Sequence, residues 1–254
     1  MDEDTQQASA EVFWKLHQGL PQQAPGSDAS TRRALAMIPG LPAAPRILDL
    51  GCGPGRQSIV LAQETEGKVV AVDLLARFLA ELDARAETAG IQDRIETVEA
   101  SMADLPYAAD SFDLIWSEGA IYNMGFAEGL GGWRGLLRTG GAMAVTDAVW
   151  LEDDPPETAS RFWKVGYPGM LSLGAAGDAV REAGFASLGC FVLAESEWWD
   201  DYYTPIEARL DSLARERDDK AWADALATHR EELEIVRQGR GSFGYAFFVM
   251  QKVD

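Results

Sequence analysis

Ile47-Leu48-Asp49-Leu50-Gly51-Cys52-Gly53-Pro54-Gly55 joins a short apolar strand to a glycine-rich turn, and a helix is predicted to follow from about residue 57 to residue 66. Glycines at alternate positions let the backbone turn tightly and approach a ligand that any side chain would exclude. The start of the following helix adds free backbone N–H groups. This order of strand, turn and helix predicts a ligand-binding turn at the edge of an α/β sheet.

The next strand, residues 68–73, is apolar and ends in a carboxylate, Asp73. An acidic residue at the end of the second strand can accept hydrogen bonds from both hydroxyls of a ribose. The glycine spacing is Gly-x-Gly-x-Gly, whereas dinucleotide-dependent oxidoreductases carry Gly-x-Gly-x-x-Gly. The turn and Asp73 together favour a binding site, and the spacing disfavours a nicotinamide-dependent oxidoreductase.

Strands and helices continue to alternate after this motif. Strands are predicted at residues 95–98, 112–116 and 142–146, with helices at residues 74–89 and 128–137. Such alternation is typical of right-handed crossovers and of a mostly parallel sheet covered on both faces. We therefore expect a doubly wound α/β fold.

The two ends of the chain are less regular. The charged helical stretch at residues 205–238 is long for a hairpin connection and predicts an inserted helical cap. The other expected elements are helices at residues 10–20, 28–38 and 178–183 and strands at residues 188–194 and 245–252.

The charge of the chain argues against several kinds of partner. Its 254 residues include 41 acidic and 22 basic side chains, which gives a formal net charge of −19. A chain this acidic is repelled by phosphates, so we expect no nucleic-acid partner and no binding to an anionic membrane surface. Hydrophobic residues at 47% and charged residues at 25% are typical of a folded globular protein.

Cysteine and histidine content limits the chemistry further. Two cysteines, Cys52 and Cys190, make no disulfide framework and have no CxxC spacing. No cluster of histidines and carboxylates has metal-ligand spacing, so no metal is expected. The acidic N-terminus is not a signal peptide, and no apolar run approaches the ~20 residues that span a bilayer. We therefore expect a cytoplasmic protein.

Five motifs follow one another along the chain: ILDLGCGPG (47–55), VVAVD (69–73), SMADLPY (101–107), DSFDLIW (110–116) and LLRTGGAMAV (136–145). In this order they resemble the motifs of the class I S-adenosylmethionine-dependent methyltransferases. The resemblance covers roughly residues 45–150 and is greatest to small-molecule enzymes, including those of ubiquinone and menaquinone biosynthesis. It implies a Rossmann-like sheet of seven strands whose last strand is antiparallel, with S-adenosylmethionine as cofactor and S-adenosylhomocysteine as its product.

The resemblance also implies a division of the chain and a set of cofactor-binding residues. Residues 1–45 would form an N-terminal helical lid, residues 46–203 and 241–254 the cofactor-binding domain, and residues 204–240 the cap. Many relatives carry Asp where Ser101 stands, so either the serine hydroxyl or the nearby Asp104 would accept a hydrogen bond from the adenine amino group. The implied cofactor contacts are Asp49, Gly51, Gly53 and Gly55 around the methionine part, Asp73 at the ribose, Leu74, Ser101 and Met102 around the adenine, and Ser117 near the methyl group.

The segment after the fourth strand, Trp116-Ser117-Glu118-Gly119-Ala120, would lie beside the transferred methyl group. DNA and RNA amino-methyltransferases show Asn or Asp-Pro-Pro-Tyr here, and this sequence does not. Glu118 is a candidate general base or a clamp for a cationic group, and its alternative is a solvated or capping carboxylate. Tyr122 and Asn123, one helical turn further on, are candidates to line the same pocket.

A second concentration of aromatic residues, Trp198-Trp199-Asp200-Asp201-Tyr202-Tyr203, follows the penultimate strand. Trp198, Trp199 and Tyr203 can enclose an apolar or cationic substrate, or they anchor the cap to the sheet. His17 is a candidate acid–base residue, and the only other histidine, His229, is expected to be exposed.

The sequence thus predicts a methyltransferase that acts on a small molecule by in-line displacement. A base such as Glu118 or His17 is needed where the nucleophile is a hydroxyl or an ammonium group. The alternative is a protein that binds S-adenosylmethionine without transferase activity and serves as a regulator or assembly partner. The aromatic segment and the cap are candidates for a homodimer interface.

Overall fold

One mixed sheet forms the centre of the computed structural model, which describes residues 3–253. Its strands are β1 (Arg46–Leu50), β2 (Lys68–Asp73), β3 (Ile95–Glu99), β4 (Phe112–Glu118), β5 (Leu137–Trp150), β6 (Leu171–Ser172), β7 (Phe185–Val192) and β8 (Phe243–Lys252). The helices are α1 (Glu3–His17), α2 (Asp28–Ala36), α3 (Arg56–Glu64), α4 (Ala76–Thr88), α5 (Phe126–Arg134), α6 (Glu157–Gly166), α7 (Leu173–Glu182), α8 (Ser196–Trp198), α9 (Thr204–Leu213) and α10 (Lys220–Gln238). Short helical turns are η1 (Gln92–Arg94), η2 (Ile121–Asn123) and the π-helical η3 (Trp199–Tyr203).

The strand order is β3-β2-β1-β4-β5-β8-β7. Strands β1 to β5 run parallel to one another, and β8 is antiparallel to both β5 and β7. The prediction of a doubly wound Rossmann-like sheet with an antiparallel last strand is confirmed. The two-residue strand β6, which pairs with the end of β5, is additional to the seven predicted strands.

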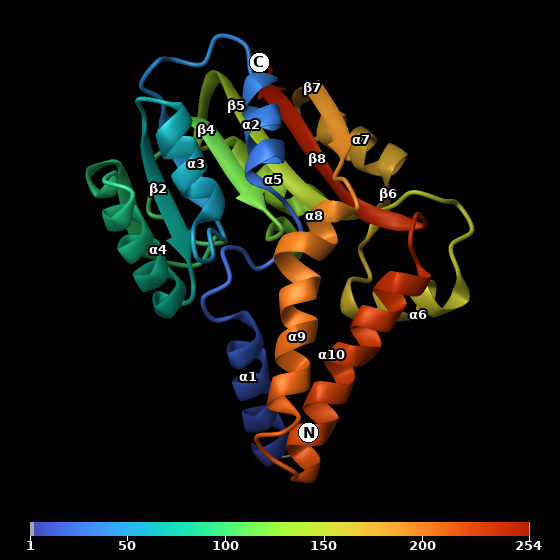
Figure 1. Cartoon of the computed structure of the whole chain (residues 1–254). Coiled ribbons are helices and arrows are strands. Elements are labelled where there is room, and N and C mark those ends of the chain that lie inside the picture. The colour runs from blue at the N-terminus through green and yellow to red at the C-terminus, as the bar shows by residue number, and fades with distance from the viewer. Residues whose placement is uncertain (1–2, 254) are drawn as a thin grey trace.

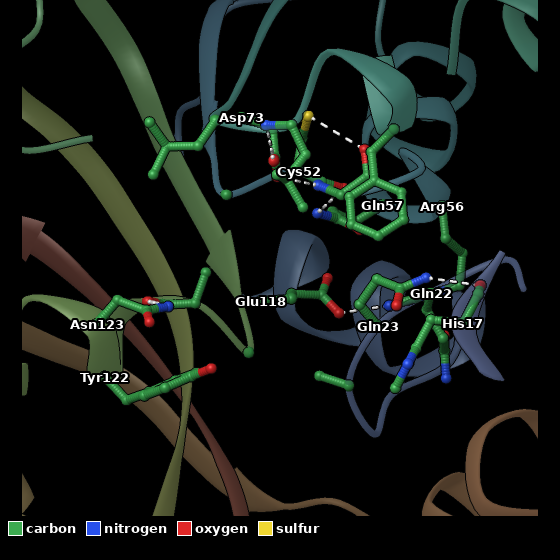
Figure 2. A pocket seen from close by; sticks show the side chains of 18 of the residues that line it. His17, Gln22, Gln23, Cys52, Arg56, Gln57, Asp73, Glu118, Tyr122 and Asn123 are labelled. Atoms are coloured by element: carbon green, nitrogen blue, oxygen red, sulfur yellow. Dashed lines mark hydrogen bonds and ion pairs between the residues drawn. The ribbon is translucent and has the colours of Figure 1, made fainter. Parts of the chain in front are cut away.

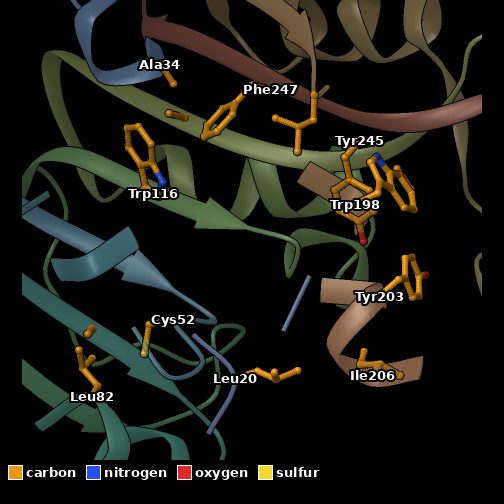
Figure 3. Packing of buried hydrophobic residues seen from close by; sticks show 14 of the residues in the cluster. Leu20, Ala34, Cys52, Leu82, Trp116, Trp198, Tyr203, Ile206, Tyr245 and Phe247 are labelled. Carbon is orange, nitrogen blue, oxygen red and sulfur yellow. The ribbon is translucent and has the colours of Figure 1, made fainter. Parts of the chain in front are cut away.

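Alternation along the strands divides the core into two layers. In β1, Ile47 packs on one face of the sheet and Leu48 on the other, and both are fully buried. On the first face, Trp116 and Phe247 meet edge to face with ring centroids 5.5 Å apart (Figure 3). Strands buried on both faces read as continuous apolar runs, which explains why the central strands are evident in the sequence.

Several boundaries differ from the prediction. β5 is much longer than residues 142–146, because it pairs with β8 from Ala142 to Trp150. The helical stretch 205–238 is two helices, and the second begins where the side chain of Asp219 accepts a hydrogen bond from Trp222 N at 3.0 Å. Helix α6 was not predicted.

Helices α1, α9 and α10 pack side by side and extend away from the sheet (Figure 1). Their shared core includes Leu16, Leu213 and Trp222, which are buried. The lid expected over residues 1–45 is therefore divided, since α1 joins the cap helices whereas α2 packs on α3 beside the sheet. Within residues 3–253, no helix combines the length and the apolar character needed to cross a membrane.

Candidate functional site

A cavity of about 650 Å³ opens where β1, β2 and β4 end, between the sheet and the cap (Figure 2). Ligands of open α/β sheets bind at these carboxyl ends. The sheet side contributes the glycine turn and the residues that follow β2, β3 and β4. The opposite wall comes from residues 13–25, from Tyr202 and Tyr203 of η3, and from the cap, including His229 and Glu232.

The glycine turn is held by backbone hydrogen bonds to the end of β2. Gly51 N and Cys52 N both donate to Val72 O, at 2.8 and 3.0 Å. Gly51 has a φ of +68°, and a Cβ there would lie 2.3 Å from the Cβ of Ala120. Glycine is required at this position by both the backbone conformation and the close approach of Ala120.

Asp73 lines the cavity and also holds two backbone segments of its wall in place. Its Oδ2 accepts a hydrogen bond from Gly53 N at 2.8 Å, and its Oδ1 accepts one from Leu75 N at 2.9 Å. The adjoining wall contains Leu74, which is 63% exposed, and also Ser101 and Met102. A carboxylate beside an apolar wall offers acceptors to ribose hydroxyls and a surface to a flat base.

Three expected cofactor contacts lie outside the cavity lining. The carboxylate of Asp49 is fully buried and accepts hydrogen bonds from Ser58 Oγ and Gln57 Nε2, and burial raises its pKa to about 7. Ser117 Oγ donates to Leu50 O at 2.8 Å. Gly55 faces helix α4, where a Cβ would meet the side chain of Leu82. Asp49, Gly55 and Ser117 shape the turn from behind instead of lining the cavity.

Glu118 lines the cavity, but both of its carboxylate oxygens already have partners. Oε1 accepts hydrogen bonds from Thr31 Oγ1 at 2.7 Å and from Trp116 Nε1 at 2.8 Å. Oε2 forms an ion pair with Arg56 at 2.5 Å, and both side chains are nearly buried. This arrangement ties α2, α3 and β4 together. The roles of general base and of clamp for a cationic group stay predictions for Glu118.

Three buried polar atoms at the cavity have no hydrogen-bond partner among the described residues: Gln22 Oε1, Gln23 Oε1 and Arg56 Nε. The amide nitrogens of the two glutamines donate to Gly26 O at 2.8 Å and to His17 O at 3.2 Å. Burying a polar group without a partner is unfavourable, so these atoms point to a ligand with complementary groups. The sequence analysis missed all three residues.

His17 is buried at the end of α1, beside the cavity. Its Nδ1 lies 2.7 Å from Phe13 O, so Nδ1 carries the proton and Nε2 keeps a lone pair, 3.4 Å from the hydroxyl of Tyr202. Burial lowers the pKa of His17 to about 4. The imidazole is therefore neutral near pH 7. The expectation that His229 is exposed is wrong, because it lines the cavity with its ring centroid 6.3 Å from that of His17.

A smaller space of about 270 Å³ adjoins the cavity and shares Tyr122, Tyr203 and Glu232 with it. We call it the tyrosine annex, because Tyr122, Tyr167, Tyr202, Tyr203 and Tyr245 line it together with Trp163, Trp198 and Glu232.

The other candidate acceptor residues are divided between three places. Asn123 lines the main cavity and Trp198 the annex. Trp199 lies outside both, in a separate hollow where Arg237 and Arg240 stack on its ring at 5.2 and 5.1 Å. Within residues 3–253, no group of three or more His, Cys, Asp or Glu side chains is arranged to hold a metal ion.

The chain resembles known methyltransferases in sequence. Residues 47–141 match the family model of a methyltransferase domain. Erythromycin 3''-O-methyltransferase of Saccharopolyspora erythraea is 29% identical over 189 residues, which cover 66% of this chain and 60% of that protein. Sarcosine/dimethylglycine N-methyltransferase of Halorhodospira halochloris is 31% identical over 153 residues, which cover 57% of this chain and 55% of that protein. The chain thus spans less than two thirds of the length of both relatives.

A solved structure shares the fold over nearly the whole chain. The S-adenosylmethionine-dependent methyltransferase of Geobacter sulfurreducens in complex with S-adenosylhomocysteine superposes with a TM-score of 0.81 at 20% identity, covering 94% of this chain and 97% of that one. Residues 47–141 therefore match a methyltransferase domain in sequence, and the chain as a whole has the fold of this S-adenosylmethionine-dependent methyltransferase.

Proposed function

We propose that the protein transfers a methyl group from S-adenosylmethionine to a small-molecule acceptor. The observation that supports this proposal most directly is that the main cavity and the tyrosine annex adjoin and share lining residues. A cavity bordered by the glycine turn and Asp73 continues into the tyrosine annex. A nucleoside-bearing donor and a separate acceptor need this arrangement, because their reacting atoms must meet in one enclosed site.

The lining of the cavity fits S-adenosylmethionine. The carboxylate of Asp73 would accept from the ribose hydroxyls, and Leu74, Ser101 and Met102 would surround the adenine. The glutamine oxygens that lack partners would accept from the ammonium group of the methionine part, and the free Nε–H of Arg56 would donate to its carboxylate. When bound, the cofactor supplies a methyl group that is already activated by attachment to a sulfonium.

The task of the protein is then to orient the acceptor and to exclude water. Residues 13–25 and the cap cover the cavity and would do both. Nε2 of His17 keeps a lone pair at neutral pH and is the proposed proton acceptor for a hydroxyl or ammonium nucleophile. Glu118 is proposed to position Arg56 instead of acting as a base.

The net charge of the chain and the small volume of the annex both support a small-molecule acceptor. The net charge of −19 disfavours a nucleic-acid substrate, and the annex is too confined for a macromolecular surface. The relatives are named for methylation of an oxygen in one case and of a nitrogen in the other. The cytoplasmic location and the homodimer interface remain predictions.

Calorimetric titration with S-adenosylhomocysteine tests the cofactor half of the proposal. Asp73→Ala should weaken binding at least tenfold, because it removes the charged acceptor for two hydroxyls. Asp93→Ala removes an exposed carboxylate on η1 and is the matched control. Unchanged affinity in Asp73→Ala would contradict the ribose assignment.

Transfer of a labelled methyl group to a panel of amines, phenols, thiols and quinols tests the other half. Labelled product from one class establishes the transferase and identifies its nucleophile. Tight binding of S-adenosylhomocysteine with no transfer to any class would argue for a binding protein.

A further inference from the structure

The tyrosine annex is built by side chains from widely separated parts of the chain. Tyr122 follows β4, Tyr167 follows α6, Tyr203 ends η3 and Tyr245 lies on β8. Their rings support one another. Tyr122 meets Tyr167 at 5.8 Å between centroids, and Trp198 meets Tyr245 edge to face at 5.3 Å (Figure 3). Rings fixed in this way enclose a space of defined shape before any acceptor binds.

The phenol groups of the annex remain uncharged. Burial raises the pKa values of Tyr167, Tyr202, Tyr203 and Tyr245 above the ordinary value for tyrosine. The face of a neutral aromatic ring carries negative electrostatic potential and attracts a cation within about 6 Å of its centre. Several such faces around one small space favour a positively charged group.

The charged side chains that line the annex also favour a cationic acceptor. Glu232 is the only charged side chain among the described residues that line it, and neither lysine nor arginine does. One carboxylate oxygen of Glu232 accepts a hydrogen bond from Tyr203 Oη at 2.8 Å, and the other has no hydrogen-bond partner among the described residues. An anionic group on the acceptor would lie beside this carboxylate with no cation to balance it.

The main cavity also lacks a free cation. Arg56 is its only arginine or lysine among the described lining residues, and Arg56 is already paired with Glu118. Asp147 lies behind the annex wall, where it accepts a hydrogen bond from Tyr167 Oη at 2.7 Å. The acceptor side of the site therefore presents aromatic rings and the carboxylate of Glu232 to whatever enters it.

We propose that the acceptor carries a positively charged amino group, which the tyrosine annex binds with Glu232 as its counter-ion. This inference rests on the proposed function, since it names the class of acceptor for that same site. It predicts selection against carboxylate- or phosphate-bearing molecules whose anionic group would enter the annex.

The test uses two ligands of equal shape and different charge on the full chain saturated with S-adenosylhomocysteine. 2-(Dimethylamino)ethanol is cationic at neutral pH, and 3-methylbutan-1-ol replaces its nitrogen by carbon. Calorimetric titration should show the amine binding about tenfold more tightly than the alcohol, with tetramethylammonium binding as well. Equal affinity of wild type for the amine and the alcohol would overturn the proposal. It would also be overturned if neither the amine nor tetramethylammonium bound to wild type.

Glu232→Gln then tests the counter-ion. Glutamine keeps an oxygen that can accept from Tyr203, so the annex should keep its shape while the amine loses about tenfold in affinity. Glu231→Gln makes the same change of charge at the adjacent, exposed position of α10 and should bind the amine as wild type does. An unchanged affinity in Glu232→Gln would also refute the proposal. If wild type did not bind S-adenosylhomocysteine at all, that result would instead contradict the proposed function.

Discussion

Replacement of Glu118 by glutamine separates a structural role from a catalytic one. The amide has the shape of the carboxylate but no charge, so Arg56 would be left buried without its main partner. Removing one member of a buried ion pair costs about 3–5 kcal/mol. Arg56 would keep its hydrogen bond to Thr31 Oγ1 at 3.1 Å and its ion pair with Asp28 at 3.4 Å. We therefore expect a loss near the lower limit, about 3 kcal/mol in the free energy of unfolding.

Urea unfolding with and without S-adenosylhomocysteine measures this loss. In thermal unfolding, about 3 kcal/mol corresponds to a decrease in Tm of roughly 6–12 °C for a chain of this size. Glu66→Gln changes an exposed carboxylate by the same charge and should leave the stability unchanged. If Glu118→Gln were as stable as Glu66→Gln and bound the cofactor normally, but transferred methyl groups a hundredfold more slowly, Glu118 would be a base and our assignment would be wrong.

Three further substitutions test the buried groups around the cavity. His17→Gln removes an imidazole whose pKa falls from 6.5 to about 4 on burial, so that below pH 6.5 the unfolded chain binds a proton that the folded chain excludes. Between pH 7 and pH 4, wild type should lose about 3 kcal/mol more stability than this variant in urea unfolding, and parallel pH profiles would contradict the assignment. Asp147→Asn has the opposite sign, because burial raises that carboxyl pKa from 3.8 to about 7, and wild type should lose about 3 kcal/mol relative to the variant as the pH rises from 4 to 7. Gly51→Ala forces an alanine into a φ of +68° and against Ala120, which should lower the free energy of unfolding by about 3 kcal/mol; a variant as stable as wild type would show that the turn is not tightly held.

The central sheet could be predicted because its signals are local. The strands β1, β2 and β4 are largely apolar segments of five to seven residues, and β1 is followed directly by the glycine-rich turn. The boundaries of β5 and β7 could not be predicted in this way, because both strands extend by pairing with β8 at the far end of the chain. Tertiary pairing, which leaves no local pattern, sets their ends.

The cofactor side of the site follows from the motif, whereas the acceptor side does not. Gly51, Gly53 and Asp73 lie within one strand–helix–strand unit, β1–α3–β2, so their spacing predicts that they meet. His17 and Tyr202 meet across 185 positions of sequence through the packing of α1 with the cap. The sequence did contain a signal for one of the site residues that we missed, Arg56. Arg56 begins a helix, where a positive charge is unfavourable unless a carboxylate such as Glu118 faces it.

The cofactor side and the acceptor side of the site are therefore supported by different observations. Most of the proposed cofactor wall lies within residues 47–141, the part that matches the methyltransferase domain, so that match bears directly on it. Most of the acceptor wall lies outside that part, in residues 13–25, in residues 202–233, and in Tyr167 and Tyr245. Because one fold hosts many functions through different sites, a match to the methyltransferase domain cannot name the acceptor. The rings and the single carboxylate of the tyrosine annex are the features that can, and they favour a cation.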